Sequence, residues 1–372
     1  MPSTMLLEVD GVEITAEDLA ALVELQAEEA TAEADAVTVT FRADASPDGE
    51  WPSLLDPLVT PRTPLVVQLT RGDVGYRFDG YSAEAVWDID AEGGSRLTVK
   101  AVDRSLDLDA EEKALGWPGQ RDSAIAETIF GSYGLDTEVE KTPDAPEPDV
   151  HIAMQRATDW AYVRALAAKW GYAAYLEAAA DLGIPGAAGT VTGHFHPIDP
   201  LADPQGEIAL GFGGDAFKAQ VRVDLLGGQR VVATRWPALA AAAVTADGPG
   251  DDEPQGADSL AAQVTTLLTP DDVTGEVDPQ EAASALARRS AYTVTLTATL
   301  DTERIGLLLR ARRPVLVRGL GSVLSGRYLV DKVRHTVTLE AHRQEVTLKR
   351  NALGVTGDEP FGATGGLLGG LL

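Results

Sequence analysis

The amino-acid sequence predicts a β-rich α+β fold, in which two antiparallel β-barrels are joined by inserted helical segments. Three observations predict it. Short, alternating runs with β-branched side chains fill about the first hundred residues, similar runs return after about residue 289, and the segment between them contains helical spacing. The 372 residues are 44% hydrophobic, which is enough apolar material for two or three domains.

Composition narrows the class of function. With 30 basic and 58 acidic residues, the chain has a formal net charge of −28, so its surface repels nucleic acid and anionic lipid. It has no cysteine, which excludes disulfides, thiolate metal sites and cysteine nucleophiles. Residues 1–12 lack a basic stretch followed by an apolar one, and no apolar run is long enough to span a membrane. We therefore expect synthesis and assembly in the cytoplasm, without membrane insertion.

The first barrel is predicted over residues 1–107. Leu6–Val9 and Val12–Ile14 flank Asp10 and Gly11, a two-residue loop typical of a tight hairpin. Thr15 is placed to cap a short helix that runs through Leu19, Leu22 and Val23. Alternating strands are then predicted at Val37–Phe41, Pro64–Leu69, Tyr76–Tyr81 and Arg96–Val102.

Residues 108–205 are predicted to form an inserted domain that contains helices. Asp122 or Ser123 is placed to cap a helix that Gly134 ends, and an acidic, proline-rich connector covers residues 141–148. Thr158 caps a second helix, which Gly171 ends and a strand at 172–176 follows. Apolar residues recur along this second helix at spacings of three or four, at Trp160, Val163, Leu166, Ala167 and Trp170.

The second half is predicted to repeat the β-rich character. Residues 206–244 form a hairpin of the second barrel, with strands 217–223 and 230–236 joined through Gly227 and Gly228. Residues 245–288 form an acidic linker and a helical insertion, with Pro279 in the first turn of a helix over 280–289. Residues 289–351 supply the remaining strands of the second barrel, and residues 352–372 form a flexible tail of glycine and leucine.

The two β-rich regions show the same sequence of strands. In both, an alternating strand is followed by a proline-led strand, a glycine-started strand and a closing alternating strand. The runs are 37–41, 63–67, 80–86 and 97–100 in the first copy and 292–296, 313–317, 326–333 and 346–350 in the second. Duplication is the favoured interpretation; the alternative is that small antiparallel barrels share this rhythm because short strands have few ways to differ. Three duplicated chains around an axis would present six similar barrels.

Several segments resemble a known family. They are Gln155–Trp160, continuing through Leu166 and Ala167 to Gly171 and Tyr172, then Gly326–His335, and the ending Leu348–Asn351. Phe78–Gly80, Val102–Ser105 and Tyr133–Leu135 extend the match. In order and spacing they are similar to the phage late control D proteins, whose relatives include contractile-tail baseplate hubs, the N-terminal part of the type VI secretion spike protein and the hubs of extracellular contractile injection systems.

This resemblance implies a structural hub protein. It implies a homotrimer with two tail-tube-like β-barrels per chain, which docks on a hexameric inner tube at one end and on a trimeric spike protein at the other, beside other baseplate subunits. The particle is then a phage tail or a contractile injection particle. The chain departs from the type VI version because it lacks the long C-terminal β-helix, so the spike is expected to be a separate protein. The tail after residue 351 is a candidate contact for it, or a frayed terminus.

Several motifs carry chemically capable residues, yet none predicts a catalytic, cofactor-binding or metal-binding site. His194 and His196 lie on one side of an extended segment, and Asp199 and Asp203 are the only nearby third ligands in the sequence. His335 and His342 have no nucleophile motif beside them, so a structural role is expected. The glycines of 318–326 lack the lysine followed by serine or threonine of a phosphate loop, which favours a turn. The acidic runs 107–112 and 251–253 lack the pattern of a calcium loop.

Two other function classes remain as alternatives. A tail-associated cell-wall hydrolase would need a convergent pair of acids or a metal site. A carbohydrate-binding module would use Trp160 and Trp170 as a sugar-stacking pair, although at helical spacing these residues more often anchor a core.

Overall fold

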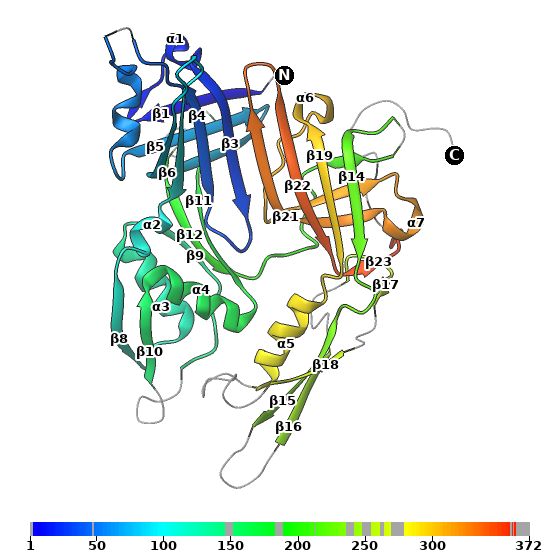
Figure 1. Cartoon of the computed structure of the whole chain (residues 1–372). Coiled ribbons are helices and arrows are strands. Elements are labelled where there is room, and N and C mark those ends of the chain that lie inside the picture. The colour runs from blue at the N-terminus through cyan, green and yellow to red at the C-terminus, as the bar shows by residue number, and fades with distance from the viewer. Residues whose placement is uncertain are drawn as a thin grey trace.

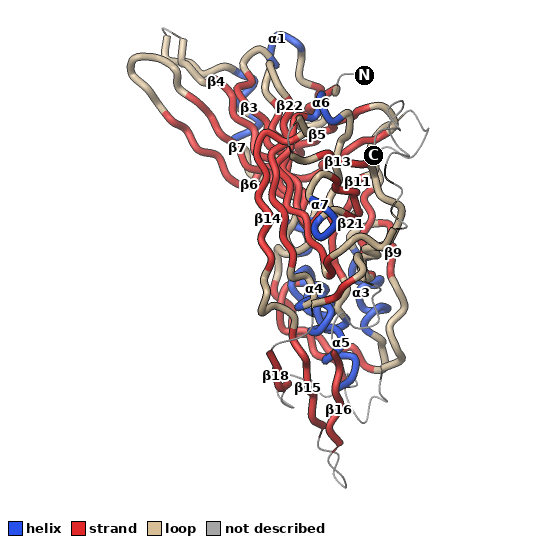
Figure 2. The backbone as a smooth tube through the Cα atoms, turned by 90° about the vertical axis from the view of Figure 1, so that its right-hand side faces the viewer, coloured by secondary structure: helices blue, strands red, loops and turns tan. Residues whose placement is uncertain are grey.

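One wide β-sheet organises the molecule in a computed structural model of the chain (Figure 1). The structure describes residues 3–46, 48–145, 152–182, 189–211, 213–235, 242–247, 254–260, 264–268, 279–357, 359 and 361. Within these ranges, 13 strands belong to the sheet, and the smaller helical and β parts lie below it in Figure 1. Figure 2 shows many of the sheet's strands running along the long axis of the molecule. None of the helices in the described ranges has the length and apolar character needed to cross a lipid bilayer.

The first β unit occupies the N-terminal part of the sheet. Its strand order is β3 (Leu22–Ala30), β4 (Ala36–Arg42), β7 (Arg96–Asp103), β6 (Val74–Asp88) and β5 (Pro64–Arg71), extended by β1 (Thr4–Val9) and β2 (Val12–Glu13). Alternate residues of these strands form one buried cluster, which includes Val39, Phe41, Val67 and Phe78. The short helical elements of this unit are α1 (Ala16–Leu19), η1 (Ser53–Leu55), η2 (Pro57–Val59) and α2 (Ser105–Leu108).

The second β unit has the same strand order. It runs β14 (Ala216–Val223), β19 (Val294–Asp301), β22 (His342–Arg350), β21 (Gly326–Val337) and β20 (Pro314–Arg318), and β13 (Glu207–Ala209) pairs with β20. Its separate core includes Leu296, Val315, Tyr328 and Leu348. Short helices α6 (Thr302–Ile305) and α7 (Gly321–Leu324) lie in its connections.

Matching irregularities identify which residues of the two units are equivalent. The β3–β4 register shifts between Leu22 and Glu24, and the β14–β19 register shifts between Ala216 and Lys218. The β6–β7 register shifts between Ser82 and Glu84, and the β21–β22 register between Val330 and Lys332. Because each bulge occupies the same place in its unit, β3 corresponds to β14 and β6 to β21, which supports a duplicated origin.

The two units join head to tail. β21 pairs with β3, from Lys332 opposite Ala30 to Val337 opposite Leu25. Eight antiparallel strands therefore follow one another in the order β14-β19-β22-β21-β3-β4-β7-β6, and β5, β1 and β2 continue the order from residues 74–81 of β6. The prediction of a β-rich fold with two similar halves is confirmed. In the described residues no ladder joins β1 or β2 back to β3, or β13 back to β14, so the ladders close neither half into a barrel.

Two smaller parts are inserted between the strands. The first contains β8 (Glu112–Pro118) paired with β10 (Ile152–Thr158), α3 (Asp122–Ser132), α4 (Asp159–Trp170), and the sheet β11 (Ala173–Ala178), β12 (Val191–His196) and β9 (Asp136–Val139). Its core includes Ile125, Phe130, Trp160 and Phe195. The second contains β15 (Gln229–Arg235), β16 (Ala242–Asp247), β18 (Val264–Leu268) and α5 (Pro279–Ser290); β17 (Asp258–Ser259) pairs with β23 (Ala352–Leu353).

Three local predictions were wrong, and two strands were missed. The helix predicted through Leu22 and Val23 ends at Leu19, and β3 begins at Leu22 because it pairs with β4 and β21. The hairpin predicted in 206–244 does not form, since β14 pairs with β19 while β15 pairs with β16 and β18. Strand β18 and the last residues of β16 lie in the region 245–288 predicted as linker and helix, and β8 and β10 were missed. Most of the predicted tail lies outside the described residues.

Candidate functional site

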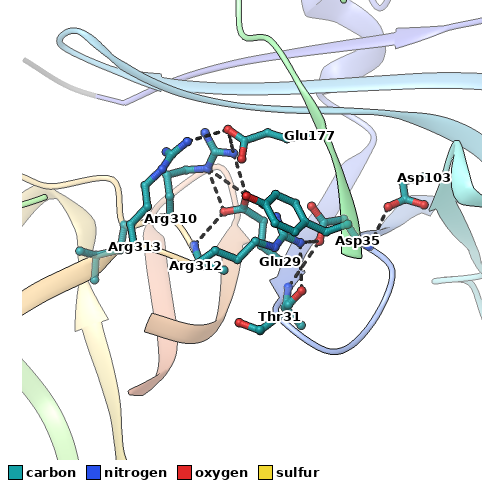
Figure 3. A network of polar contacts seen from close by, with 12 residues as sticks. Glu29, Thr31, Asp35, Asp103, Glu177, Arg310, Arg312 and Arg313 are labelled. Atoms are coloured by element: carbon teal, nitrogen blue, oxygen red, sulfur yellow. Dashed lines mark hydrogen bonds and ion pairs between the residues drawn. The ribbon is translucent and has the colours of Figure 1, made fainter. Parts of the chain in front are cut away.

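A buried ionic junction connects the two β units (Figure 3). Arg310, in the segment between α6 and β20, is 4% exposed, and Glu29 of β3 is 1% exposed. Arg310 Nε donates to the two Glu29 oxygens at 3.0 and 2.9 Å, and Nη2 donates to Oε1 at 2.7 Å. The N–H of Ala311 donates to Oε2 of Glu29 at 3.2 Å, and Arg310 Nη1 donates to the carbonyl of Gly75 at 2.6 Å. These charge-assisted bonds compensate the removal of both ions from water.

Arg312 extends the junction toward the turn between β3 and β4. Its Nη2 donates to the carbonyl of Ala30 at 2.9 Å and also forms an ion pair with Asp35. The N–H of Asp35 donates to Oδ2 of Asp103 at 3.0 Å, which fixes this turn against the end of β7. Arg312 has a φ of 65°, a conformation that a bulky residue rarely adopts, so the surrounding contacts hold the backbone in place.

The inserted domain contributes a third part to the junction. Arg313 Nη2 donates to Oε1 of Glu177, on β11, at 2.6 Å, and Arg310 Nη2 lies 3.3 Å from the same oxygen. The Arg312 guanidinium lies over the Tyr175 ring, 4.2 Å from its centroid. The four-residue segment 310–313 therefore ties both β units and the inserted sheet together, as Figure 3 shows for the charged side chains.

The charges of the junction shift its carboxyl groups in opposite directions. Burial acts to raise the pKa of Glu29, but the positive charge and hydrogen bonds of Arg310 outweigh it and lower that pKa to about 2. Burial raises the pKa of Asp35, and the nearby charges of Glu29 and Asp103 add to the rise although Arg312 opposes it. Glu29 is therefore the firmly ionised partner of Arg310 at neutral pH.

The second candidate site is a pair of free strand edges at the ends of the eight-stranded stretch. In the described ladders, β14 pairs with β19 alone, and residues 84–88 of β6 pair with β7 alone. Lys218 and Arg222 are exposed on β14, whereas Glu84 and Asp88 are exposed on β6. An exposed strand edge is a template for pairing with another chain, and these two edges carry opposite charges.

The structure brings one predicted metal-ligand pair together and supplies a different third residue. His194 and His196 lie on β12 with Glu138 of β9, and their ligand atoms lie within 4.8 Å of one another. Asp199 and Asp203, the third ligands considered from the sequence, are not in this group. His335 and His342 are buried, and His335 Nδ1 lies 3.1 Å from His342 Nε2 between β21 and β22. Their predicted structural placement agrees with this packing.

The remaining sequence candidates occupy structural positions. Trp160 is buried in the core of the inserted domain, and Trp170 Nε1 donates to Asp122 at 2.7 Å. The glycines of 318–326 connect β20 to β21 around α7. Asp107 pairs with Arg62, and Asp109 accepts a hydrogen bond from Thr158. Residues 251–253 lie outside the described residues.

The junction residues were not predicted from the sequence. A signal exists at 307–314, where three leucines lead into Arg310, Arg312 and Arg313 directly before a proline-led strand. Charges that interrupt an apolar run next to a buried strand indicate buried ion pairs. Their partners are not visible in this way, because Glu29 lies 281 residues from Arg310.

Comparisons with known proteins agree with this architecture. No protein-family model and no curated protein matches the sequence. Among solved structures, the 43 kDa tail protein of prophage MuSo2 from Shewanella oneidensis has a TM-score of 0.65 at 14% identity, over 95% of this chain and 100% of that one. A tail protein from Neisseria meningitidis has a TM-score of 0.64 at 13% identity, over 95% of this chain and 98% of that one. This chain has the fold of phage tail proteins.

A type VI secretion protein shares this tail-protein fold. It is a component of that system in Escherichia coli, described as structurally similar to bacteriophage T4 tail proteins, and it has a TM-score of 0.53 at 12% identity, over 92% of this chain and 76% of that one. The resemblance found in the sequence is confirmed at the level of the fold.

Proposed function

We propose that this chain is a structural hub protein in the baseplate of a contractile phage-tail-like particle or an extracellular contractile injection system. In this proposal it forms a homotrimer that adapts a hexameric inner tube to a trimeric spike protein, and it contacts other baseplate subunits. In this proposal the protein acts through its interfaces and not through catalysis. The net charge of −28 disfavours a nucleic-acid partner.

The observation that carries the proposal is the head-to-tail joining of two equivalent β units. Since β21 corresponds to β6 and β3 to β14, the β21–β3 ladder is a template for pairing β6 of one copy with β14 of the next. Such a contact joins different surfaces of the two copies, and heterologous contacts of this kind generate rings when the rotation closes. Three copies would present six units to a sixfold tube.

The template also gives a register for the proposed contact. Within the chain, Arg334 lies opposite Glu28 and His335 lies opposite Ala27. At the equivalent positions of the proposed contact, Val86 of one copy would lie opposite Arg222 of the next, and Trp87 opposite Val221. These pairings follow from the matched bulges alone.

The side chains on the two edges suit this register. Arg222 would lie diagonally between Glu84 and Asp88, within reach of both carboxylates. On the other face, Trp87 is partly buried against the first core and Val221 against the second, so an apolar layer would continue across the contact.

Mass measurement tests the assembly. Multi-angle light scattering of the full chain should give three times the mass of one chain, at salt concentrations near physiological. A stable monomer across the same concentration range would contradict the proposal. Deposition of tube protein or spike protein on the purified trimer, followed by negative-stain microscopy, would then test the two docking surfaces.

A further inference from the structure

A row of polar side chains crosses the small sheet of the inserted domain. His194 lies opposite Tyr175 of β11 on one side and opposite Glu138 of β9 on the other. His196 follows two residues later, so its side chain is on the same face of the sheet as that of His194. The opposite face is apolar, because Phe195 is fully buried and Gly193 packs against the Phe130 ring. The polar face therefore gathers four side chains from three strands.

The donor atoms have the spacing of a metal coordination sphere. His194 Nδ1 lies 3.2 Å from His196 Nε2 and 3.4 Å from Glu138 Oε2. Zinc binds nitrogen and oxygen ligands at about 2.0–2.2 Å in tetrahedral geometry, which separates neighbouring ligand atoms by about 3.3–3.5 Å. These two spacings lie close to this edge length, and the ligand atoms of His196 and Glu138 lie within 4.8 Å of each other. A carboxylate and two imidazoles are also ligand types that suit zinc.

The surroundings orient the histidines as ligands. His196 Nδ1 lies 2.8 Å from the carbonyl oxygen of Pro197, which can only accept, so Nδ1 carries the proton and Nε2 is left with its lone pair facing His194. The Tyr175 ring stacks on His194 at 4.4 Å with an angle of 6° between the planes, and its hydroxyl lies 3.3 Å from His196 Nε2.

We propose that Glu138, His194 and His196 form a zinc-binding site. The Glu138 side chain is 67% exposed, which gives the ion a path from solvent, whereas the His194 side chain is 11% exposed and anchored by the Tyr175 ring. A bound ion would cross-link β9 and β12, the parallel pair at the edge of the small sheet. The fourth position is open to water or to the Tyr175 hydroxyl. The site is separate from the proposed contact between copies, since none of its residues lies on β6 or β14.

Zinc titration of the full chain tests the proposal. Protein treated with a chelator and then dialysed is titrated with zinc sulfate by isothermal calorimetry, and one ion per chain is expected to bind. Glu138→Gln and His196→Ala should each weaken binding by at least about 100-fold, because even loss of a group that only orients a metal ligand costs about 10 to 100-fold. Glu140→Gln, an exposed carboxylate near the end of the same strand, is the matched control and should bind as the wild type does.

Cobalt substitution gives a second readout that needs no variant. Cobalt(II) bound in the proposed site should give the intense visible absorption of a four-coordinate ion, and added zinc should remove it. The proposal is overturned if zinc does not bind, if binding is equal in His196→Ala and Glu140→Gln, or if the cobalt spectrum stays that of the hydrated ion. The three side chains would then be a hydrogen-bonded cluster only.

Discussion

Arg310 of the second β unit donates three hydrogen bonds of 2.7–3.0 Å to Glu29 of the first unit, and both side chains are buried. The two residues are 281 positions apart in the sequence, so their contact exists only once both units have formed and met. The junction lies beside the β21–β3 ladder, in which Glu29 is opposite Val333, and this ladder is the template for the proposed contact between copies.

Arg310→Met should destabilise the protein strongly. The change leaves the Glu29 carboxylate buried without its main partner, and the loss of one member of a buried ion pair costs about 3–5 kcal/mol. Arg318→Met is the matched control, because Arg318 pairs with Glu207 but is 58% exposed, and exposed pairs contribute about 1 kcal/mol or less. Urea unfolding followed by circular dichroism measures both. Equal losses of unfolding free energy in the two variants would show that the buried ion pair stabilises the protein no more than an exposed pair does.

Glu29→Gln should make stability less sensitive to acid. The folded pKa of Glu29 is lowered to about 2 from an ordinary value near 4.5, so its contribution is complete above pH 4.5 and is lost as the pH falls toward 2. The difference in unfolding free energy between wild type and Glu29→Gln should therefore be largest at pH 6–7 and shrink toward pH 2. Denaturant titrations at several pH values check this. A difference that is constant with pH would contradict the assignment of an ionised Glu29.

Gly80→Ala should destabilise the first β unit. A Cβ atom at this position in β6 would lie 2.2 Å from the carbonyl oxygen of Val102 on β7. This oxygen belongs to the backbone, so no change of side-chain rotamer can relieve the clash. Overpacking of this kind costs about 1–3 kcal/mol. Gly131→Ala is the control, because Gly131 lies in α3 with open space around it, and alanine favours a helix by about 1 kcal/mol. Thermal unfolding should show opposite shifts in the two variants.

Arg222→Glu should weaken self-association without unfolding the chain. In the proposed register it would place a third carboxylate between Glu84 and Asp88 of the neighbouring copy, and like charges across strands are destabilising. Sedimentation velocity over a dilution series should show dissociation at higher protein concentration than for the wild type. Arg42→Glu, an exposed change on β4 inside the sheet, should leave association unchanged. Restoration of the trimer by the double reversal Glu84→Arg and Asp88→Arg in the Arg222→Glu chain would identify the partner edge.

Local periodicity predicted the elements that are fixed by local chemistry. Thr158 and Gly171 bound α4 as expected, since the Thr158 hydroxyl accepts from the N–H of Ala161 and Gly171 adopts a φ of 71°. The proline-led strands of both units and the glycine-started strand at Gly326 were also correct, whereas Gly80 lies in the middle of β6 and does not begin a strand. The segment from Leu22 was predicted to be helical, because its apolar spacing there fits a helix. The segment forms a strand instead, because it pairs with β4 and β21. The β21 strand lies far along the chain: Thr31, just after β3, donates to the carbonyl of Asp331, which is 300 residues away.

Sites that depend on distant pairing could be predicted only in part. The spacing of His194 and His196 identified two members of the polar row, whereas Glu138 was missed because the parallel pairing of β9 with β12 leaves no local pattern. The arginines at 310–313 give a sequence signal, but their acidic partners on β3, β11 and the β3–β4 turn do not. The failed hairpin has the same cause, since Gly227 and Gly228 predict a turn without saying which strands it joins.

Disulfide cross-linking of the two free edges tests the central claim, that copies of this chain pair β6 with β14 in a closed ring of three. The chain has no cysteine of its own, so a Val86→Cys, Arg222→Cys double variant reports on this contact alone. Residues opposite each other on antiparallel strands have Cα atoms about 4.5–5.5 Å apart, within the range of a disulfide. Val86→Cys with Ala219→Cys, whose side chains would point to opposite faces, is the control. Oxidation should convert the first variant to covalent trimers and nothing larger. Monomers that stay uncross-linked, ladders that pass three copies, or equal cross-linking of the control would contradict the account.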